Sequence, residues 1–296
     1  IVHHFLYNAI GPCFESSFVA DSCACIKGRG TLYAAERLES KIRSISQNWS
    51  RPASYLKMDL ANFFVTINKR VLGEQLQAKI TEPEWLRLAE VILWHDPRKN
   101  FVMRGNPELL ELVPPHKRLT NQIAYLGLPI GNLSSQFFAN VYLNALDQFA
   151  KHKLRCKHYS RYVDDFILLH EDPKQLSAWR REIEEWLPHT LGVHVNTSKT
   201  IEQPISRGVD FVGQVIKPHR RTMRRRTMND AVKRIKTGDG NQFEQINSYF
   251  GLTTQASHRH NDSIRIAKAA LSQGYVVNLA ANKCYRKKSK TTIEGK

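Results

Sequence analysis

The sequence lacks the cysteine pattern of a disulfide scaffold or of a zinc module. Its five cysteines form no CxxC pair and no spacing with histidines that suits zinc. An odd set of this kind is typical of free thiols in a reducing compartment. Cys23 and Cys25 could form half of a metal site, and small residues of a core are the simpler interpretation.

Long hydrophobic runs are also missing. The longest apolar stretches, 137–143 and 163–169, are much shorter than the roughly 20 residues of a membrane-spanning helix. The N-terminus does not have the layout of a signal peptide, so we expect a cytoplasmic protein with no membrane partner. The sequence begins with Ile1 rather than methionine, and we expect it to be trimmed at its start.

Acidic residues are scarce relative to basic ones. The 296 residues include 44 Lys and Arg but 27 Asp and Glu, which gives a formal charge of +17. Such an excess favours a polyanionic partner, and nucleic acid is the first candidate. Charge alone suits a ribosomal, a chromatin-like or an enzymatic protein equally well. With 42% hydrophobic residues, the chain can build a substantial core.

The chain has no internal repeat, but its composition changes near residue 217. Before that point, strand-like and helix-like segments alternate, which predicts an α+β fold. From 217 to 234 there are eight Lys or Arg and one acid, and short helical patterns follow. We expect a hairpin at 157–170, strands at 53–59, 193–201 and 209–216, and helices at 69–80, 83–95, 134–152 (with Ser134 as a possible N-cap) and 172–190.

Two adjacent carboxylates, Asp164 and Asp165, interrupt a run that otherwise reads as a buried strand. Neighbours on a strand point to opposite faces, so both can reach the same space only at a hairpin tip. A solvated turn would also explain the pair, because aspartate favours turns. The apolar residues on both sides, 162–163 and 166–169, instead indicate burial. Crowded carboxylates at such a point need protons, cations or metal ions.

A third acid, Asp59, ends the strand predicted at 53–59. If it lies beside the hairpin, the three carboxylates form an oxygen-only cluster of the kind that Mg²⁺ prefers. Two Mg²⁺ ions would outweigh the three negative charges and leave positive charge for an incoming triphosphate. A pair of divalent ions is the known device for in-line attack at phosphorus.

Four segments resemble motifs of reverse transcriptases, in the same order along the chain. Residues 162–165 (YVDD) resemble the YxDD signature, and 57–64 (KMDLANFF) resemble the first palm motif. Residues 192–200 (GVHVNTSKT) are similar to the lysine-bearing motif, and 210–213 (DFVG) to the primer-grip hairpin. The resemblance, over roughly residues 20–218, implies a right-hand polymerase fold of the α+β class. The implied domains are fingers and an antiparallel palm at 1–218 and a short, basic, α-helical thumb with a C-terminal tail at 219–296.

The segment before the hairpin narrows the resemblance. Most intron-type and viral enzymes carry Gln-Gly and Ser-Pro there, whereas 128–136 reads LPIGNLSSQ, with Ile130, Gly131 and Gln136. This form resembles the reverse transcriptases of diversity-generating retroelements, which make adenine-mutagenised cDNA. A retron or group II intron-type enzyme is the alternative within the class. A non-catalytic RNA-binding protein on a polymerase fold is the alternative outside it, and the retained acids argue against it.

The resemblance implies roles for individual residues. Asp59 and Asp164 would bridge both Mg²⁺ ions, with Asp165 beside them and the Leu60 carbonyl on the nucleotide-side metal. The implied dNTP contacts are Lys27, Arg29, Phe64, Ile130, Gly131, Gln136 and Lys199. The implied nucleic-acid contacts are Arg220, Arg221, Arg224, Arg225 and Arg226, although the basic segment could also be only a solvated face.

Several of these roles have simpler alternatives. Phe64 would exclude a ribose 2′-hydroxyl, or it is a core aromatic. Lys27 and Arg29 lie between glycines that let a loop approach phosphates, or they form an exposed basic turn. Lys199 would act near the leaving pyrophosphate, or it is one more solvated lysine. Ile130 cannot make the hydrogen bonds of the usual glutamine, and we expect it, together with Gln136, to loosen selection against mispairs.

The resemblance also implies partners. These are a structured template RNA, the RNA–DNA duplex formed with its cDNA, and dNTPs. In this family a small basic helical accessory protein, assembled as a pentamer, supplies further nucleic-acid contacts.

Overall fold

The structure is a computed structural model, and it describes residues 1–238 and 242–286. The chain divides into two compact units, Ile1–Ile205 and Ser206–Lys296. The boundary that we expect at 218/219 between palm and thumb stays a prediction. Within the described residues, no helix combines the length and the apolar character needed to cross a bilayer.

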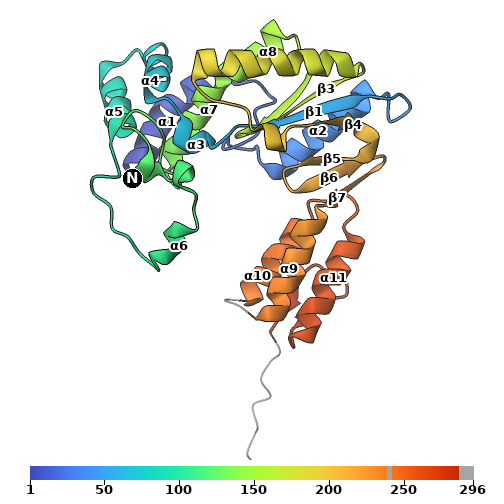
Figure 1. Cartoon of the computed structure of the whole chain (residues 1–296). Helices are drawn as coiled ribbons and strands as arrows, with labels where there is room; N and C mark the ends of the chain where they lie inside the picture. Colours follow the sequence, from blue (N-terminus) through green and yellow to red (C-terminus); the bar gives the residue numbers. More distant parts are fainter. Residues whose placement is uncertain (239–241, 287–296) are drawn as a thin grey trace, which may run out of the picture. The chain divides into compact units, whose positions relative to one another are not determined.

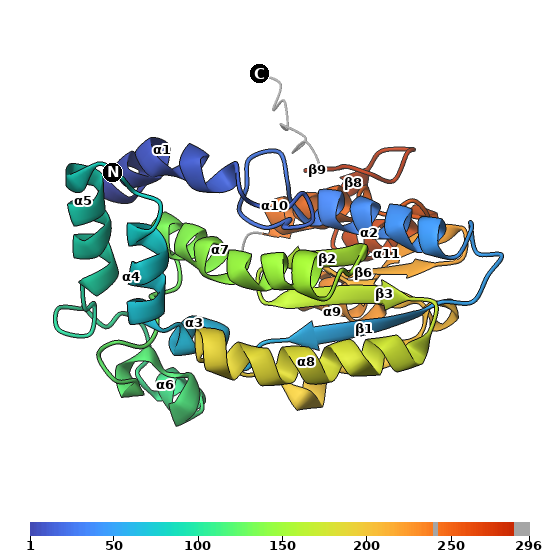
Figure 2. The same ribbon diagram turned by 90° about the horizontal axis from the view of Figure 1, so that it is seen from above.

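The first unit is built on a four-stranded antiparallel sheet with the strand order β2-β3-β1-β4. Figure 1 shows α8 lying over this sheet, and Figure 2 shows the same unit from above. The strands are β1 (Ser54–Asp59), β2 (His158–Tyr162), β3 (Asp165–His170) and β4 (Ile201–Pro204). The helices are α1 (Val2–Glu15), α2 (Thr31–Ile45), α3 (Phe63–Thr66), α4 (Lys69–Gln77), α5 (Pro83–Trp94), α6 (Glu108–Glu111), α7 (Leu133–Gln148) and α8 (Pro173–Leu191).

Helix α8 begins and ends where its sequence signals predict. The side chain of Asp172 accepts a hydrogen bond from the Lys174 backbone, and Pro173 occupies the first turn, where its missing N–H costs nothing. Gly192 ends the helix in the left-handed conformation, with φ 66°. The helix packs on β1 and β3 through one apolar face. The helix predicted at 172–190 is therefore confirmed.

Helix α7 differs from the prediction at both ends. Its N-cap is Asn132, so Ser134 as an N-cap was wrong. Ser134 lies inside the first turn, buried, and its hydroxyl is 2.7 Å from His3 Nδ1. After Gln148 the chain continues as one π-helical turn, Phe149–Lys153, so the predicted helix at 134–152 is regular only in part.

The strand predicted at 193–201 is wrong for most of its length. Only Ile201–Pro204 forms a strand, β4, on the edge of the sheet. Before it, Val195 makes a single bridge to Leu60, and a 3-10 turn follows at Thr197–Lys199. The segment therefore crosses the end of β1 instead of extending the sheet.

Within its described residues, the second unit combines two small antiparallel sheets with three helices. The larger sheet has the order β5-β6-β7, the smaller pairs β8 with β9, and α9, α10 and α11 pack together around a core of their own (Figure 1). The strands are β5 (Val209–Phe211), β6 (Gln214–Lys217), β7 (Arg220–Met223), β8 (Val276–Val277) and β9 (Cys284–Tyr285). The helices are α9 (Arg225–Thr237), α10 (Gln242–Thr253) and α11 (His260–Ser272).

The strand predicted at 209–216 is a hairpin of β5 and β6. The chain reverses at Val212 and Gly213, which have φ values of 46° and 80°. A single strand was the wrong interpretation, because two successive left-handed residues end an extended segment. The hairpin form agrees with the resemblance of residues 210–213 to a primer-grip motif.

Candidate active site

The register of the first sheet brings the three predicted acids together. Strand β1 ends at Asp59 and β3 begins at Asp165, and these two residues are direct partners in the antiparallel pairing. Directly paired residues have Cα atoms about 5 Å apart. Tyr162 pairs with Asp165 on the other side, so Val163 and Asp164 alone form the tip of the β2–β3 hairpin. The hairpin tip predicted from the sequence is confirmed.

The hairpin tip has a strained backbone, and a buried side chain stabilises it by a hydrogen bond. Val163 has a φ of 55°, a left-handed conformation that a β-branched residue rarely adopts. Its carbonyl accepts a hydrogen bond from Nη1 of Arg161 at 3.0 Å. Arg161 is 0% exposed. Its guanidinium also bonds both carboxylate oxygens of Asp147 on α7, at 2.7 and 2.6 Å. The position of Asp164 therefore depends on a buried ion pair.

Further bonds complete this buried network. The Tyr159 hydroxyl donates to Asp147 at 2.8 Å, and Arg161 Nη2 donates to the Ser22 hydroxyl at 2.9 Å. Burial opposes the charge of Arg161, but Asp147 keeps the pKa of the guanidinium above its usual value. Burial and Asp147 together raise the pKa of Tyr159, so its hydroxyl stays a donor. Arg161 was not predicted as a site residue, because its partner Asp147 lies on another element and β2 (HYSRY) has no apolar pattern that would mark it as buried.

Two lysines each pair with one of the three acids at the site. Lys57 Nζ lies 2.9 Å from Asp165 Oδ2, and Lys199 Nζ lies 2.9 Å from Asp59 Oδ1. The structure thus brings Lys199 to the carboxylates. Lys57 was not singled out as a site residue, although strand alternation places it on the same face as Asp59.

The carboxylates influence one another electrostatically. Burial raises the pKa of Asp164, and the charge of Asp59 adds to this. Burial also raises the pKa of Asp165 to about 6; Lys57 lowers this pKa, and the charges of Asp59 and Asp164 add smaller increases. The hydrogen bond to Asp59 raises the pKa of Lys199. The site is therefore short of positive charge.

Backbone bonds fix the segment that follows β1. The Leu60 N–H donates to the Asp164 carbonyl at 3.3 Å, which ties β1 to the hairpin tip. The Asn196 N–H donates to the Asp59 carbonyl at 2.7 Å, and its side-chain amide lies 3.4 Å from Asp59 Oδ1. Asn196 is a further site residue that the sequence did not reveal.

The side chains of the three acids are the type of ligand that a hard divalent cation prefers. All three side chains offer only oxygen, and the buried Oδ1 of Asp165 has no hydrogen-bond partner among the described residues. In the structure, lysines pair with Asp59 and Asp165. Among the described residues, no three His, Cys, Asp or Glu side chains lie close enough together to hold a metal ion. The residues present fit Mg²⁺ by chemistry and by charge, and binding at Asp59, Leu60, Asp164 and Asp165 remains a prediction.

Arg29 stabilises the basic turn between Gly28 and Gly30 through hydrogen bonds to the backbone. Arg29 Nη1 donates to the carbonyls of Val19 and Ser22, at 3.0 and 2.7 Å. Lys27 is exposed, and Gly28 has a φ of 79°. These contacts give Arg29 a structural task, and contacts of Lys27 and Arg29 with a triphosphate stay predictions.

The residues expected around the nucleotide differ in exposure. Phe64 is partly buried, and its ring centre lies 5.4 Å from that of Phe63; its role under the sugar stays a prediction. Ile130 is 78% exposed, beside Gly131 with a φ of 109°. Gln136 is exposed in the first turns of α7. An isoleucine this open contributes little to the core.

The five arginines expected to bind nucleic acid have different surroundings. Arg220, Arg225 and Arg226 are exposed. Arg224 Nε donates to Asp210 Oδ1 at 2.9 Å. Arg221 is only 5% exposed, and its guanidinium donates to the Gln255 carbonyl at 2.9 Å. The burial of Arg221 indicates a structural role in the second unit.

Residues 2–216 match the reverse transcriptase (RNA-dependent DNA polymerase) family. The chain belongs to this family. Its members are RNA-directed DNA polymerases, which are nucleotidyltransferases that use divalent metal ions. No curated protein matches the chain.

The chain is also similar to solved telomerase structures. Telomerase from Candida tropicalis in complex with a TWJ fragment of telomeric RNA is 15% identical, with a TM-score of 0.56 over 92% of this chain and 45% of that chain. Telomerase from Candida albicans with a TWJ fragment is 14% identical, with a TM-score of 0.49 over 92% and 46%. The chain spans less than half the length of these proteins. The first likeness supports the fold alone, and the predicted α+β polymerase fold is confirmed.

Proposed function

We propose that the chain is the polymerase of an RNA-directed DNA synthesis system and adds dNTPs to a primer at Asp59, Asp164 and Asp165. The observation that carries this proposal is the register that pairs Asp59 with Asp165 at the base of the Asp164 hairpin tip. Family membership supports the same activity. Close acids with an unpartnered buried oxygen are costly unless cations join them, which favours a catalytic role over a structural one.

Asp59, Asp164, Asp165 and the Leu60 carbonyl would hold two Mg²⁺ ions. When bound, such a pair lowers the barrier to attack of a primer 3′-hydroxyl on the α-phosphate and stabilises the leaving pyrophosphate. The chain's own contribution is positioning, because Arg161 fixes the hairpin tip through the Val163 carbonyl.

Charge near the acids is supplied by the two lysines. Lys199 would move from Asp59 to the leaving pyrophosphate, as a charge or a proton donor, since its side chain is the more exposed partner of the pair. Lys57 would keep Asp165 ionised near neutral pH. Phe64 would lie under the deoxyribose, and the exposed arginines of the second unit, Arg220, Arg225 and Arg226, would contact the phosphates of the duplex.

At a finer level, we propose that the enzyme belongs to a diversity-generating retroelement, of the phage-borne, tropism-switching kind. The support is the LPIGNLSSQ form of residues 128–136, together with the 78% exposure of Ile130. An exposed alkyl group can pack against a base pair but cannot brace it by hydrogen bonds. The partners would be a structured template RNA and a pentameric, basic, helical accessory protein.

A primer-extension assay tests the general proposal. The chain is given an RNA template, a DNA primer, dNTPs and Mg²⁺, with and without the product of the neighbouring accessory gene. We expect template-directed addition of deoxynucleotides in at least one arm. If the protein binds the duplex in both arms and extends the primer in neither, it is a non-catalytic RNA-binding protein.

The sequence of the products tests the finer proposal. We expect substitutions concentrated opposite template adenines. Errors spread evenly over the four template bases would favour a retron or group II intron-type enzyme instead.

A further inference from the structure

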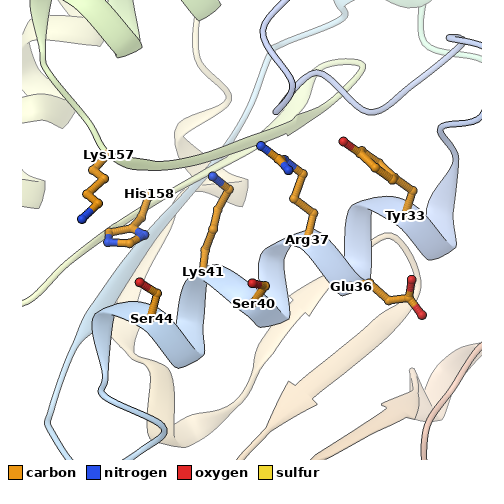
Figure 3. A pocket seen from close by; sticks show the side chains of 8 residues that line it. All are labelled: Tyr33, Glu36, Arg37, Ser40, Lys41, Ser44, Lys157 and His158. Carbon is orange, nitrogen blue, oxygen red and sulfur yellow. The ribbon is translucent and has the colours of Figure 1, made fainter.

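A cavity of about 460 Å³ lies between α2 and the beginning of β2 in the first unit (Figure 3). Every residue that lines it is polar or charged. The lining includes the side chains of Tyr33, Arg37, Ser40, Lys41, Ser44 and Lys157.

This cavity is separate from the predicted catalytic acids. His158, at its edge, pairs with Leu169, whereas Tyr162 at the other end of β2 pairs with Asp165. The two ends are four residue steps apart along the strand, which is about 13 Å. The contacts proposed for polymerisation therefore leave this cavity unexplained.

The cavity carries more positive charge than its acids can balance. Asp21, which is 3% exposed, accepts Arg37 at 2.6 Å, Lys41 at 2.9 Å and Lys151 at 2.9 Å. One carboxylate thus serves three cations. Of these three cations, Arg37 and Lys41 line the cavity; Lys157 adds a further positive charge to the lining, and Glu36 is the one acid among its described residues.

The excess of positive charge also affects the pKa of His158. Burial lowers the pKa of His158 to about 4, and the charges of Lys41, Lys157 and Lys151 lower it further than Asp21 raises it. A group with negative charge is therefore favoured in the cavity.

The donors form a row instead of a single point. Arg37, Lys41 and Ser44 follow one another at spacings of four and three residues, so they share one face of α2, as Figure 3 shows. The row is about 10 Å long at the rise of an α-helix, which is more than one phosphate group can fill. Tyr33 continues it, with the Arg37 guanidinium 5.9 Å from its ring centre.

We propose that this cavity binds the phosphodiester backbone of an RNA strand, at a site outside the polymerase centre. A row of guanidinium, ammonium and hydroxyl donors matches the evenly spaced anionic oxygens of such a strand. An acidic protein partner is less suited, because the lining offers no aliphatic anchor of the kind that protein interfaces use. The site would hold part of an RNA that extends beyond the copied segment.

The test is RNA affinity, measured by fluorescence anisotropy on the full chain over a range of salt concentrations. The probe is a labelled single-stranded RNA of mixed sequence, in EDTA and without dNTPs, so the result does not depend on the polymerase proposal. The main variant is Lys157→Glu, because Lys157 is exposed and is not one of the three cations held by Asp21. Ser44→Glu is the second variant, on the other wall of the cavity.

Lys174→Glu is the matched control for Lys157→Glu, since Lys174 is exposed on α8 and its substitution gives the same change in net charge. We expect Lys157→Glu and Ser44→Glu to weaken binding three- to tenfold at 0.1 M salt and to reduce the salt dependence, with the control within twofold. Unchanged melting temperatures confirm that the variants fold.

Three results would overturn the proposal. One is an equal loss of affinity in Lys157→Glu and Lys174→Glu, and another is no loss in either cavity variant. The third is a result of competition experiments with millimolar inorganic pyrophosphate, or with an acidic peptide that carries the same total charge as the RNA. In that result, the competitor displaces the RNA from the wild-type protein but not from Lys157→Glu. That result would mark a general anion site or a protein site.

Discussion

Asp59 lies directly opposite Asp165 where β1 and β3 pair, and each carboxylate is held by a different lysine at 2.9 Å. The pairing makes two like charges neighbours at the end of a buried sheet, which is unfavourable in a purely structural strand pair. Lys57 and Lys199 offset part of this cost. The arrangement is best explained by a ligand that brings further positive charge.

Breaking the buried pair beneath the hairpin should destabilise the protein strongly. Arg161→Met leaves Asp147 charged and fully buried, and we expect a loss of about 3–5 kcal/mol in the free energy of unfolding. The double variant Arg161→Met with Asp147→Leu should recover most of that loss, because no charge remains buried. Denaturant unfolding measures both.

The control for this prediction is Arg180→Met, which removes the more exposed pair with Glu184 at 2.8 Å. We expect a cost of under about 1 kcal/mol there. A loss as small as this in Arg161→Met would show that the buried network does not stabilise the hairpin.

His158 should make stability fall in mildly acidic solution. An ordinary histidine has a pKa of 6.5, and burial, followed by nearby lysines, lowers that of His158 to about 4. His158 therefore binds a proton more readily in the unfolded chain than in the folded one. The contribution of neutral His158 to folding stability is complete above pH 6.5 and is lost as the pH falls toward 4. His158→Gln should lose less thermal stability between pH 7 and pH 5 than wild type. His152→Gln, at an exposed position, controls for the substitution, and parallel curves for wild type and His158→Gln would contradict the prediction.

Ile130 should control errors at template adenine. Ile130→Gln restores an amide that can bond the nucleotide and template pair, and we expect fewer misincorporations opposite adenine, by severalfold, with little change opposite other bases. The side chain is open to solvent, so the protein should remain folded. Sequencing of extension products gives the error rates. Exposed Ile201→Gln is the control, and an unchanged adenine error rate in Ile130→Gln would remove Ile130 from the account.

Local signals in the sequence predicted the elements that carry the site. Pro173 after an aspartate and Gly192 at the other end define α8, and the apolar residues around Asp164 define the hairpin. These features depend on neighbours in the chain, so a single sequence contains them. The grouping of Asp59 with the hairpin was proposed from its place at a strand end and supported by the family resemblance, and the strand register agrees with it.

Features that depend on distant partners could not be predicted. Arg161 gains its role from Asp147 on another element, and Lys41 gains its role from Asp21, which comes from a loop. The stretch at 193–201 has an apolar alternation like that of a strand, but its hydrogen bonds go to the end of β1 instead. Tertiary contacts overrode local propensity there.

Iron-mediated cleavage can show whether a divalent metal ion binds at the three acids. Fe²⁺ replaces Mg²⁺ at oxygen ligands and, with ascorbate and peroxide, cuts the nearby backbone, so the cut positions locate bound metal without any need for activity. With a dNTP present, we predict cuts near residues 59 and 164–165 that excess Mg²⁺ suppresses and that Asp59→Asn or Asp164→Asn abolishes, while exposed Asp230→Asn changes nothing. Cuts that persist in both variants, or that lie elsewhere, would contradict a metal centre at these three acids.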